Sequence, residues 1–449
     1  MRSAVIWKSL DRISGIFKHI IIAAAIGLSG QLDIFYMTMA LMGVFVFTWA
    51  QLLEVMAVPK LVELNKSEDK KPFTSLASGL FTLSLLFSII LAIILLLGRN
   101  GWSHVAWGFD SERKSHLAEA FIWFSPVIIF YIPLNFIGSV FRAVRKFTIF
   151  YQAEFIIAIV SLSLIFFFKD SSNVLLWSFS VGTLVAFFYI FISFLHNFKA
   201  FGNPLSRDVL TVLRIAPGLL ILQCAHYLYI LTDRVFISFL GSGCLGALAY
   251  GRTLAFFIEG IMGIKKSFIT IFSEATENNK KNEIYNNLIS LAVYISIPLT
   301  IFLLFFGVDI ISIFLERGMF TSSDTRLVNL SLSGFCWSLL PMVLQVPMEQ
   351  IFQVHGKIDL MVRRKILGLI TNVVLNSFFL FVLKWGIWGI ALATSLSYWV
   401  VTLYSIHAAV RLRLILVYQR HFKWMFWMAS GSFMAAFAVQ KAGMYTICK

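Results

Sequence analysis

The sequence is poor in charge. Only 13% of its 449 residues are Asp, Glu, Lys or Arg, whereas 59% are hydrophobic. Soluble domains carry about 25% charged residues, so this composition excludes an ordinary soluble fold. Apolar runs of roughly 20 residues recur along the chain, and runs of this length cross a bilayer as helices. Because backbone groups in hydrocarbon must pair within their own segment, the sequence predicts an all-α polytopic membrane protein.

Cysteines and catalytic motifs are also scarce. Cys224, Cys244, Cys336 and Cys448 lie far apart and lack paired spacing, so neither a disulfide framework nor a zinc site is expected. The chain has no H-E-x-x-H motif and no nucleophile elbow. Connections between the apolar runs reach only about 20 residues, which leaves little room for the active site of a membrane glycosyltransferase. These absences favour a transporter over an enzyme.

Positive charge is present in excess, with a net charge of +15. The basic residues lie at the ends of apolar runs and form no continuous basic face that could contact nucleic acid, so we expect no nucleic-acid partner. Lys18 and His19 interrupt the first apolar run. A cleavable signal peptide is therefore not expected.

Twelve apolar spans are predicted, and a weaker thirteenth run follows. They lie near residues 13–29, 34–58, 76–98, 117–141, 149–168, 174–195, 215–240, 245–264, 287–306, 327–352, 366–383 and 388–410, with the weaker run at 424–440. If the N-terminus is inside, 25 of the 37 Lys and Arg residues lie on the inner side, nine on the outer side and three within or at the edge of spans. This bias predicts a multi-pass membrane protein with a cytoplasmic N-terminus.

A polar connection at 199–214 divides the spans into two sets of six. We expect an N-lobe at 1–198, a C-lobe at 199–413 and a C-terminal segment at 414–449 that holds the thirteenth span. A shift of 214 residues sets IGLSGQLDIFYM at Ile26 against LGSGCLGALAYG at Leu240. Such a pseudo-repeat around a central cavity is typical of repeat-built transporters, although apolar segments also resemble one another by chance.

Cationic side chains within the spans form the first candidate site. Arg12, Lys18 and His19 belong to the first span and Arg252 to the eighth. Ionisable groups in the membrane are costly and mark functional paths by default. Several cations in a cavity of low dielectric suit a diphosphate. Alternatively, Arg12 is a topology charge and the Lys18 side chain snorkels to the interface.

Polar side chains of the seventh span form the second candidate site. Gln223, His226, Tyr229 and Asp233 fall on one helical face. Asp233 pairs with the adjacent Arg234 in the simpler interpretation. In the sharper one, Asp233 joins three oxygen-bearing residues of the eleventh and twelfth spans, Asn372, Asn376 and Thr394, to bind a hard monovalent cation or a proton.

Several segments resemble the MurJ (MviN) lipid II flippase family of the multidrug/oligosaccharidyl-lipid/polysaccharide (MOP) exporter superfamily. They are DRISGIFKHIIIAAAIGLSGQLDIFY at Asp11, AVPKLVE at Ala57, DRVFISFLGSGCLGALAYGRTL at Asp233, ERGMFTSSDT at Glu316 and GIALATSLS at Gly389. The likeness extends to about Arg413.

The resemblance implies a V-shaped bundle of two six-helix lobes around a cationic cavity. It implies a flippase of the bacterial inner (cytoplasmic) membrane. Such a flippase carries an undecaprenyl-diphosphate-linked peptidoglycan precursor, lipid II, from the inner to the outer leaflet by alternating access, without a cofactor. Four positions match essential cavity residues of the family, Arg12, Lys18, Asp33 and Arg252, with Lys18 where an Arg is usual. Four others match a proposed Na+ or H+ site, Asp233, Asn372, Asn376 and Thr394, with Asn376 where an acid is usual.

The chain departs from the family pattern in two places. In the second span Ala50 and Gln51 replace the usual Glu-Gly pair and no Arg is present. Thirteen spans are predicted, whereas the family generally has fourteen. A flippase for another polyprenyl-diphosphate-linked polysaccharide unit, a MOP-type small-molecule antiporter and a non-transporting scaffold therefore stay open as alternatives. We expect a monomer whose partners are membrane lipids and a lipid-linked saccharide.

Overall fold

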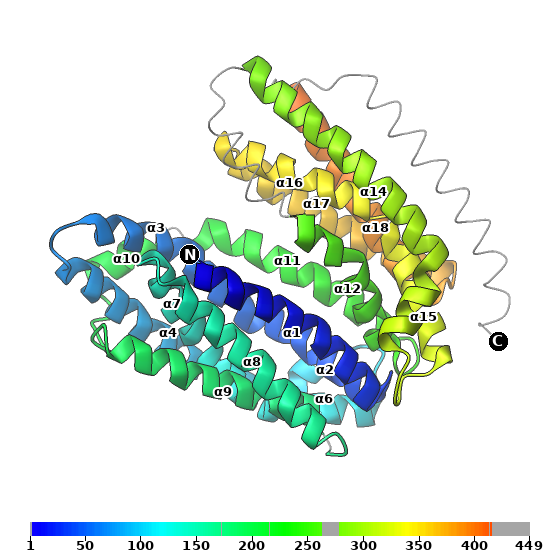
Figure 1. Cartoon of the computed structure of the whole chain (residues 1–449), viewed down its shortest axis with the longest axis horizontal. Coiled ribbons are helices and arrows are strands. Elements are labelled where there is room, and N and C mark those ends of the chain that lie inside the picture. Colours follow the sequence, from blue (N-terminus) through cyan, green and yellow to red (C-terminus); the bar gives the residue numbers. More distant parts are fainter. Residues whose placement is uncertain (1, 172, 215, 263–277, 413, 415–449) are drawn as a thin grey trace. The chain divides into compact units, whose positions relative to one another are not determined.

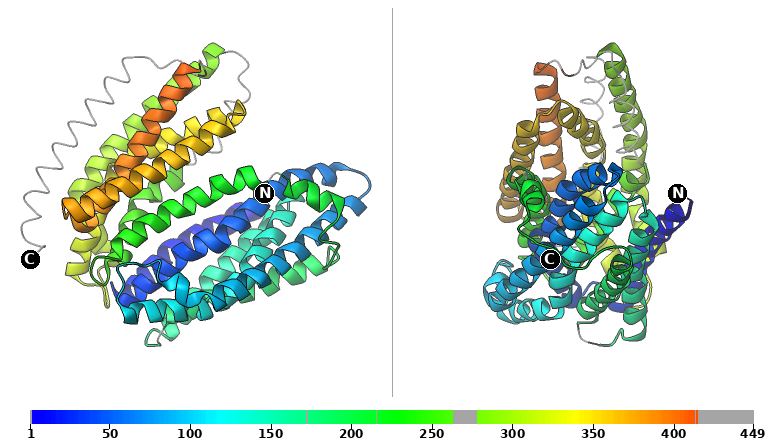
Figure 2. Two further views of the ribbon diagram at one scale, coloured as in Figure 1. Left: turned by 180° about the vertical axis from the view of Figure 1, so that it is seen from behind. Right: turned by 90° about the vertical axis from the view of Figure 1, so that its left-hand side faces the viewer.

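The computed structural model describes residues 2–171, 173–214, 216–262, 278–412 and 414, and for some helical positions it describes the backbone alone. Every regular element in these ranges is a helix. The chain forms two compact units (Figures 1 and 2). The first unit contains residues 1–247 and 314–325, and the second contains residues 248–313 and 326–449.

The first unit is a helical bundle. Its helices are α1 (Arg2–Ile26), α2 (Gly30–Met42), the π-helical turn η1 (Gly43–Phe47), α3 (Thr48–Lys66), α4 (Lys71–Leu97), α5 (Arg99–Ser103), α6 (Ser111–Trp123), α7 (Ser125–Ala143), α8 (Phe147–Phe167), α9 (Val174–Leu195), α10 (Arg207–Leu213) and α11 (Ala216–Ile237). Helix α8 packs against both α9 and α1, and α7 packs against α3, α4 and α9. Large aromatic side chains fill the space between them, including a stacked pair of rings at Phe187 and Phe191.

Helix α12 (Cys244–Met262) begins in the first unit and continues into the second. The remaining helices of the second unit are α14 (Asn278–Leu315), α15 (Ser322–Cys336), α16 (Leu339–Val354), α17 (Ile358–Ser377), the π-helical turn η2 (Phe378–Val382) and α18 (Gly386–Arg411). Helices α15 and α16 meet at a bend of 47°. Helix α18 packs against α16 and α17, and Phe335, Leu392 and Phe352 lie in the apolar interior.

The all-α membrane fold predicted from the apolar runs is confirmed, and each of the twelve predicted spans overlaps a helix. Within the described ranges, nine helices are long and apolar enough to cross a membrane, and the bent pair α15 and α16 makes a tenth. The protein is therefore a multi-pass membrane protein. Helix α1 starts at Arg2, eleven residues before the predicted span, because its charged first turns are helical as well. The predicted span at 424–440 lies outside the described residues.

The two compact units do not follow the predicted division at residues 198 and 199. Helix α11, assigned from the sequence to the C-lobe, packs against α2 and α3 and belongs to the first unit. The division into two lobes of six spans stays a prediction, because contacts within one structure do not report which helices move together.

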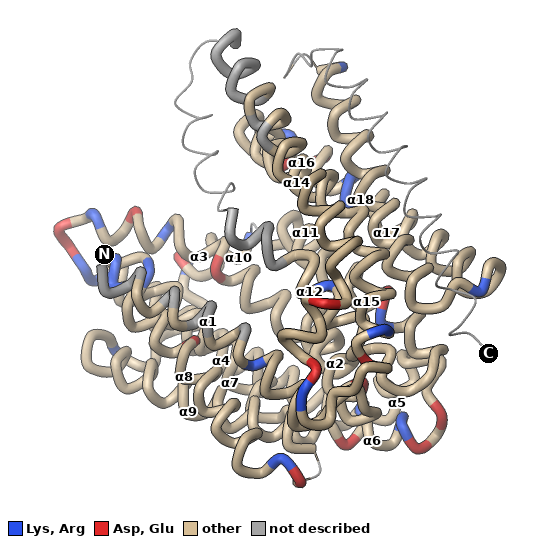
Figure 3. The backbone as a smooth tube through the Cα atoms, turned by 45° about the vertical axis from the view of Figure 1, so that its right-hand side comes forward, with Lys and Arg blue, Asp and Glu red and all other residues tan. Residues whose placement is uncertain are grey.

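Charged positions of the first unit gather at helix ends and connections, with long uncharged stretches between them (Figure 3). One basic residue of the second unit differs from expectation. Arg364, which the sequence places in an inner connection, lies within α17 and is 1% exposed. Its Nη2 donates to Gln345 Oε1 at 3.1 Å. It is therefore a buried cation that joins α17 to α16.

The close packing of α8 against α9 leads to the first prediction, which concerns the stability of a glycine variant. A Cβ added at Gly182 would lie 2.8 Å from the carbonyl oxygen of Ile157, and backbone cannot move aside without separating the two helices. We expect Gly182→Ala to lower the free energy of unfolding by about 1–3 kcal/mol. Thermal unfolding of the purified protein in detergent measures this loss.

Gly218→Ala is the matched control, because nothing lies within 4 Å of a Cβ at that position of α11. It is expected to leave stability unchanged or to raise it by up to about 1 kcal/mol, the helix preference of alanine. Equal behaviour of the two variants would contradict the described packing of α8 on α9.

Candidate functional site

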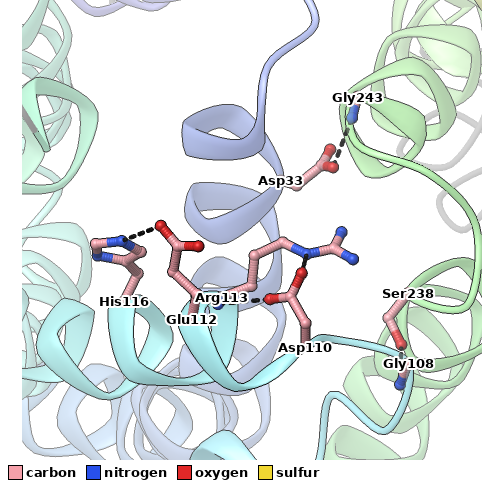
Figure 4. Close-up of polar contacts among 8 residues, drawn as sticks. All are labelled: Asp33, Gly108, Asp110, Glu112, Arg113, His116, Ser238 and Gly243. Carbon is pink, nitrogen blue, oxygen red and sulfur yellow. Dashed lines mark hydrogen bonds and ion pairs between the residues drawn. The ribbon is translucent and has the colours of Figure 1, made fainter.

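Asp33 makes the most distinctive polar contact of the first unit. Its carboxylate accepts a hydrogen bond from the backbone N–H of Gly243 at 2.7 Å (Figure 4). It accepts a second one from the backbone N–H of Gly246 at 3.0 Å. These N–H groups lie at the start of α12, where a helix has unpaired donors and a partial positive charge. The side chain is 0% exposed. Asp33 therefore caps a helix that lies more than 200 residues further along the chain.

Local sequence explains how the two segments come together. Ser29 caps α2 by accepting a hydrogen bond from the N–H of Leu32, which places Asp33 in the first turn of the helix. Gly243 has a φ of +86°, a backbone conformation that side chains other than glycine rarely adopt. This turn allows the 240–246 segment to lie against Leu28 and Leu32.

Two further connections join the same region. The N–H of Met319 donates to the carbonyl oxygen of Ala24 at 2.9 Å, near the end of α1. The N–H of Gly108 donates to Ser238 Oγ at 3.0 Å (Figure 4). We call this set of contacts, made by residues 24–33, Gly108, 238–246 and Met319, the Asp33 clasp. It joins four connections of the first unit.

The clasp contains three of the segments that carry the family resemblance. Within the third, ERGMFTSSDT, the hydroxyl of Thr325 donates to Glu316 Oε2 at 2.8 Å. Thr321 donates its N–H to Asp324 Oδ2 at 2.8 Å, which fixes the turn at the start of α15. The motif residues thus shape the loop that places Met319 against α1.

A polar pocket of about 920 Å³ lies beside the clasp. Its lining includes Gln31 and Ser242 of the clasp and several charged residues, Asp110, Glu112, Arg113, His116, Glu119, Lys169 and Asp170. Asp110 caps α6 by accepting from the N–H of Arg113 at 2.8 Å, and this hydrogen bond lowers the pKa of the Asp110 carboxyl (Figure 4). The pocket is rich in acid, so it does not resemble a diphosphate site.

Lys18 is directed toward the interior of the first unit. Its Nζ lies 4.8 Å from the centre of the Phe179 ring on α9 and 6.0 Å from that of Phe35 on α2. These distances are typical of cation–π contacts, which stabilise a charge where water is scarce. His19, the next residue of α1, is half-buried. Lys18 and His19 are therefore held within the protein, as an intramembrane charge requires.

Arg12 and Arg252 complete the predicted cationic set. Arg12 is placed on α1, but its side chain lies outside the described residues. Arg252 lies on α12 in the second unit, half-buried, with its guanidinium 5.2 Å from the centre of the Phe256 ring. Their joint action with Lys18 on one ligand stays a prediction.

The predicted polar stripe lies on α11. His226 is exposed, Gln223 and Tyr229 are half-buried, and Asp233 is 1% exposed. The neighbouring Arg234 donates from Nη1 to the carbonyl oxygen of Tyr36 and lies 5.4 Å from the centre of that tyrosine ring. Arg234 is thus a bridge from α11 to α2.

The remaining members of the predicted cation site form a buried chain in the second unit. Asn376 donates to Asn372 Oδ1 at 3.1 Å, and Asn372 donates to Thr394 Oγ1 at 3.3 Å. All three side chains are 0% exposed. The structure thus places these three residues of α17 and α18 next to one another. Asp233 belongs to the other unit, so the four-residue site is not tested. Among the described residues, no three His, Cys, Asp or Glu side chains gather as a metal site.

Comparison with known proteins decides the family. The family model described as lipid II flippase MurJ matches residues 22–447. The chain belongs to the MurJ family. Among curated members, the probable lipid II flippase MurJ of Buchnera aphidicola subsp. Schizaphis graminum is 25% identical over 418 residues, which cover 87% of this chain and 79% of that protein. The corresponding protein of Thermotoga maritima is 24% identical over 397 residues, which cover 86% and 80%.

Solved structures share the fold. A lipid II flippase MurJ in an inward closed conformation superposes with a TM-score of 0.78 at 19% identity, covering 98% of this chain and 93% of that one. An inward-facing multidrug resistance MATE family transporter of the MOP superfamily superposes with a TM-score of 0.75 at 15% identity, covering 92% and 98%. The MurJ family fold thus extends to transporters with other cargoes, and the fold by itself does not assign the cargo.

Sequence reasoning selected Asp33 but missed its partners. They are backbone N–H groups, which carry no side-chain signal. The glycines of LGSGCLG were the available hint, because a glycine-rich turn before an apolar helix is a ready site for an anion. The predicted internal repeat aligns this segment with IGLSGQLD. In the structure the two segments contact each other.

The second prediction concerns how readily the clasp opens. Cys244 lies half-buried at the start of α12, directly beside the capped N–H groups, and its thiol reports local opening. Asp33→Ala removes two hydrogen bonds to a charged group, each worth about 1.5–3 kcal/mol. In purified protein in which Cys244 is the sole cysteine, we expect maleimide to label this variant at least about tenfold faster than the parent.

Asp110→Ala is the control, because it removes a carboxylate from the adjacent pocket without touching Gly243 or Gly246. Labelling of Cys244 is expected to change by less than about twofold in this variant, because Asp110 caps α6 and not α12. Faster labelling in both variants, or in neither, would show that the Asp33 hydrogen bonds do not hold this end of α12.

Proposed function

We propose that this protein moves lipid II from the inner to the outer leaflet of the bacterial cytoplasmic membrane. The observation that carries the proposal is the match of the lipid II flippase family model to residues 22–447, because it includes nearly every described helix. A multi-pass helical bundle with cations inside its first span suits this task. It shields a charged, hydrophilic head group from hydrocarbon, where an unpaired charge is prohibitively costly.

The proposed orientation has the N-terminus in the cytoplasm. It is supported by the 25 Lys and Arg residues assigned to the inner side, against nine on the outer side. With this orientation, the Asp33 clasp lies at the outer end of the helices. The short connection between α7 and α8, which contains Arg145 and Lys146, lies at the inner end.

The proposed diphosphate site consists of Arg12, Lys18, His19 and Arg252. Arg presents a planar fork that matches phosphate oxygens, and Lys supplies a compact charge. Lys18 lies on aromatic rings, and among its described contacts it has no carboxylate partner. A diphosphate that approaches it therefore displaces no described counter-ion, which favours binding.

The proposed gate is the Asp33 clasp. Its hydrogen bonds connect the first predicted lobe, through Asp33, with the second predicted lobe, through Gly243 and Gly246. Alternating access needs the lobes to separate on one side at a time, so these bonds must break when the outer side opens. Two charge-assisted hydrogen bonds hold the closed form by several kcal/mol, about 1.5–3 each, and substrate binding must offset this difference.

We propose that an ion gradient or the membrane potential shifts the equilibrium between the closed and open forms of the clasp. Asp233 supplies the carboxylate, and the buried Asn372, Asn376 and Thr394 supply neutral oxygens for Na+ or H+. Because Asn376 replaces the usual acid, a cation there would meet one negative charge instead of two. We therefore propose that coupling is weaker in this chain than in relatives with both acids.

We also propose that the protein works as a monomer and that its cargo is the peptidoglycan precursor. One chain contains both predicted halves, so it supplies both walls of an alternating-access path. A small-cation antiporter of the same superfamily would need acidic groups where this chain has Lys18 and Arg252. A flippase for another polyprenyl-diphosphate saccharide shares the diphosphate chemistry, and experiment must separate it.

The third prediction tests the diphosphate site in the host. Depletion of the protein should lower the amount of lipid II at the outer leaflet, and the wild-type gene should restore it. Arg12→Ala and Arg252→Ala each remove one charge from the proposed site, and loss of a charge-assisted contact costs about 1.5–3 kcal/mol, or more than tenfold in binding. We expect neither variant to restore growth or lipid II exposure.

Lys71→Ala is the matched control, because it also removes one positive charge but from an exposed position at the start of α4. It should restore both readouts. Full complementation by Arg12→Ala and Arg252→Ala would overturn the diphosphate site. Unchanged lipid II exposure on depletion, with loss of a surface polysaccharide, would overturn the cargo while leaving the flippase mechanism.

A further inference from the structure

The first unit contains a second polar pocket, distinct from the clasp and from the pocket beside it. It has a volume of about 360 Å³ and lies among α3, α7, α8 and α11. This volume falls within the range of about 300–1,000 Å³ found for small-ligand sites. In the proposed orientation it lies toward the inner end of the bundle, near the connection from α7 to α8, where a head group would be loaded.

A π-helical turn shapes one wall of this pocket. At η1, the hydroxyl of Thr48 donates to the carbonyl oxygen of Gly43 at 3.0 Å. A Cβ at Gly43 would lie 2.5 Å from the Tyr227 ring, so the glycine admits that ring from α11. The turn places Phe47 against two aromatic rings, with centroids 4.6 Å from Tyr131 and 6.2 Å from Tyr227. Single π-helical turns are frequent at functional sites.

Amide and phenol groups provide the polar part of the lining. The amide nitrogen of Gln51 donates to the hydroxyl of Tyr227 at 2.7 Å. The amide nitrogen of Asn135 donates to the carbonyl oxygen of Tyr131 at 2.9 Å. Each amide thus keeps its oxygen as an acceptor for a ligand, and each phenol can donate as well as accept. Within the described part of the chain, neither amide oxygen accepts a hydrogen bond.

The basic residue of the described lining, Arg142, is already paired. Arg142 Nη1 lies 2.8 Å from Glu54 Oε1, and Nη2 donates to Ser139 Oγ at 3.0 Å. The guanidinium also lies 4.1 Å from the centre of the Phe150 ring. Glu154 adds a second carboxylate to the described lining. Because the Arg142 guanidinium is already paired with Glu54, it is not available to bind a diphosphate.

We propose that this pocket binds an uncharged, hydroxyl-bearing sugar ring of the lipid-linked head group, and this inference rests on the proposed function. Sugar hydroxyls donate and accept hydrogen bonds, which matches the amide and phenol groups of Gln51, Asn135 and Tyr131. The C–H face of a sugar ring fits the negative faces of the aromatic rings. The diphosphate remains on the cations of the proposed site, so recognition of sugar and recognition of diphosphate are separate.

Binding of two lipids that differ only in the head group tests this assignment. The purified full-length protein is titrated with undecaprenyl diphosphate and, separately, with lipid II, and affinities are measured by native mass spectrometry. Gln51→Leu and Asn135→Leu are each expected to weaken lipid II binding about 3- to 10-fold, the effect of one lost hydrogen bond. Affinity for undecaprenyl diphosphate should change by less than about twofold, because this lipid has no sugar to occupy the pocket.

Gln152→Leu is the matched control. Gln152 accepts a hydrogen bond from the hydroxyl of Tyr189 at 2.6 Å, the same pair of groups as Gln51 with Tyr227, but it does not line the pocket. It should leave both affinities unchanged. Gel filtration and thermal unfolding confirm that each variant remains folded.

The outcomes separate the two proposals. Wild-type protein that binds neither lipid contradicts the proposed function. Wild-type protein that binds both lipids equally well, or pocket variants that weaken both lipids to the same degree, contradicts the sugar pocket and leaves the proposed function intact. An equal loss that depends on Na+ concentration would assign the pocket to a cation and would also overturn the sugar assignment.

Discussion

The hydrogen bonds between the Asp33 carboxylate and the first N–H groups of α12 hold together the region on which the proposed mechanism depends. A fully buried carboxylate is costly unless its oxygens are paired, and here both oxygens meet donors at a positive helix end. The short turns that contain Gly243 and Met319 can approach α1 and α2 only while this arrangement persists. In the proposed mechanism the clasp is the closed state, and breaking these hydrogen bonds is the energetic cost of opening it.

Charge is distributed so that different parts of one ligand meet different surfaces. Lys18 lies on aromatic rings without a neighbouring carboxylate among its described contacts, whereas Arg142 is neutralised by Glu54. The first arrangement attracts an anion and the second does not. A lipid-linked saccharide has both an anionic diphosphate and uncharged sugar rings, and the proposed sites divide along the same line. In this proposal the clasp controls release of the ligand, so neither site has to change its own chemistry during transport.

The helices could be predicted because apolar runs of membrane length have few other ways to satisfy their backbone. Helical spacing placed Asn372 and Asn376 one turn apart on one span, but it could not show that Thr394 of the next span lies beside them. The partners of Asp33 could not be predicted, since backbone donors leave no trace in residue identity. Arg234, which bonds to the Tyr36 carbonyl, and Arg364, which is buried within α17, show the same limit. Charge patterns locate span ends, but tertiary contacts decide what each cation binds.

Reversible locking of the clasp tests the central claim most directly. A Cβ at Gly30 would lie 3.3 Å from Ser242 Oγ, so Gly30→Cys with Ser242→Cys places two thiols within bonding distance. In a chain without its four native cysteines, reconstituted in vesicles, the oxidised double variant should bind lipid II without translocating it, and reduction should restore translocation. Translocation at the same rate by fully cross-linked and reduced protein would contradict the account, because the clasp would then not need to open.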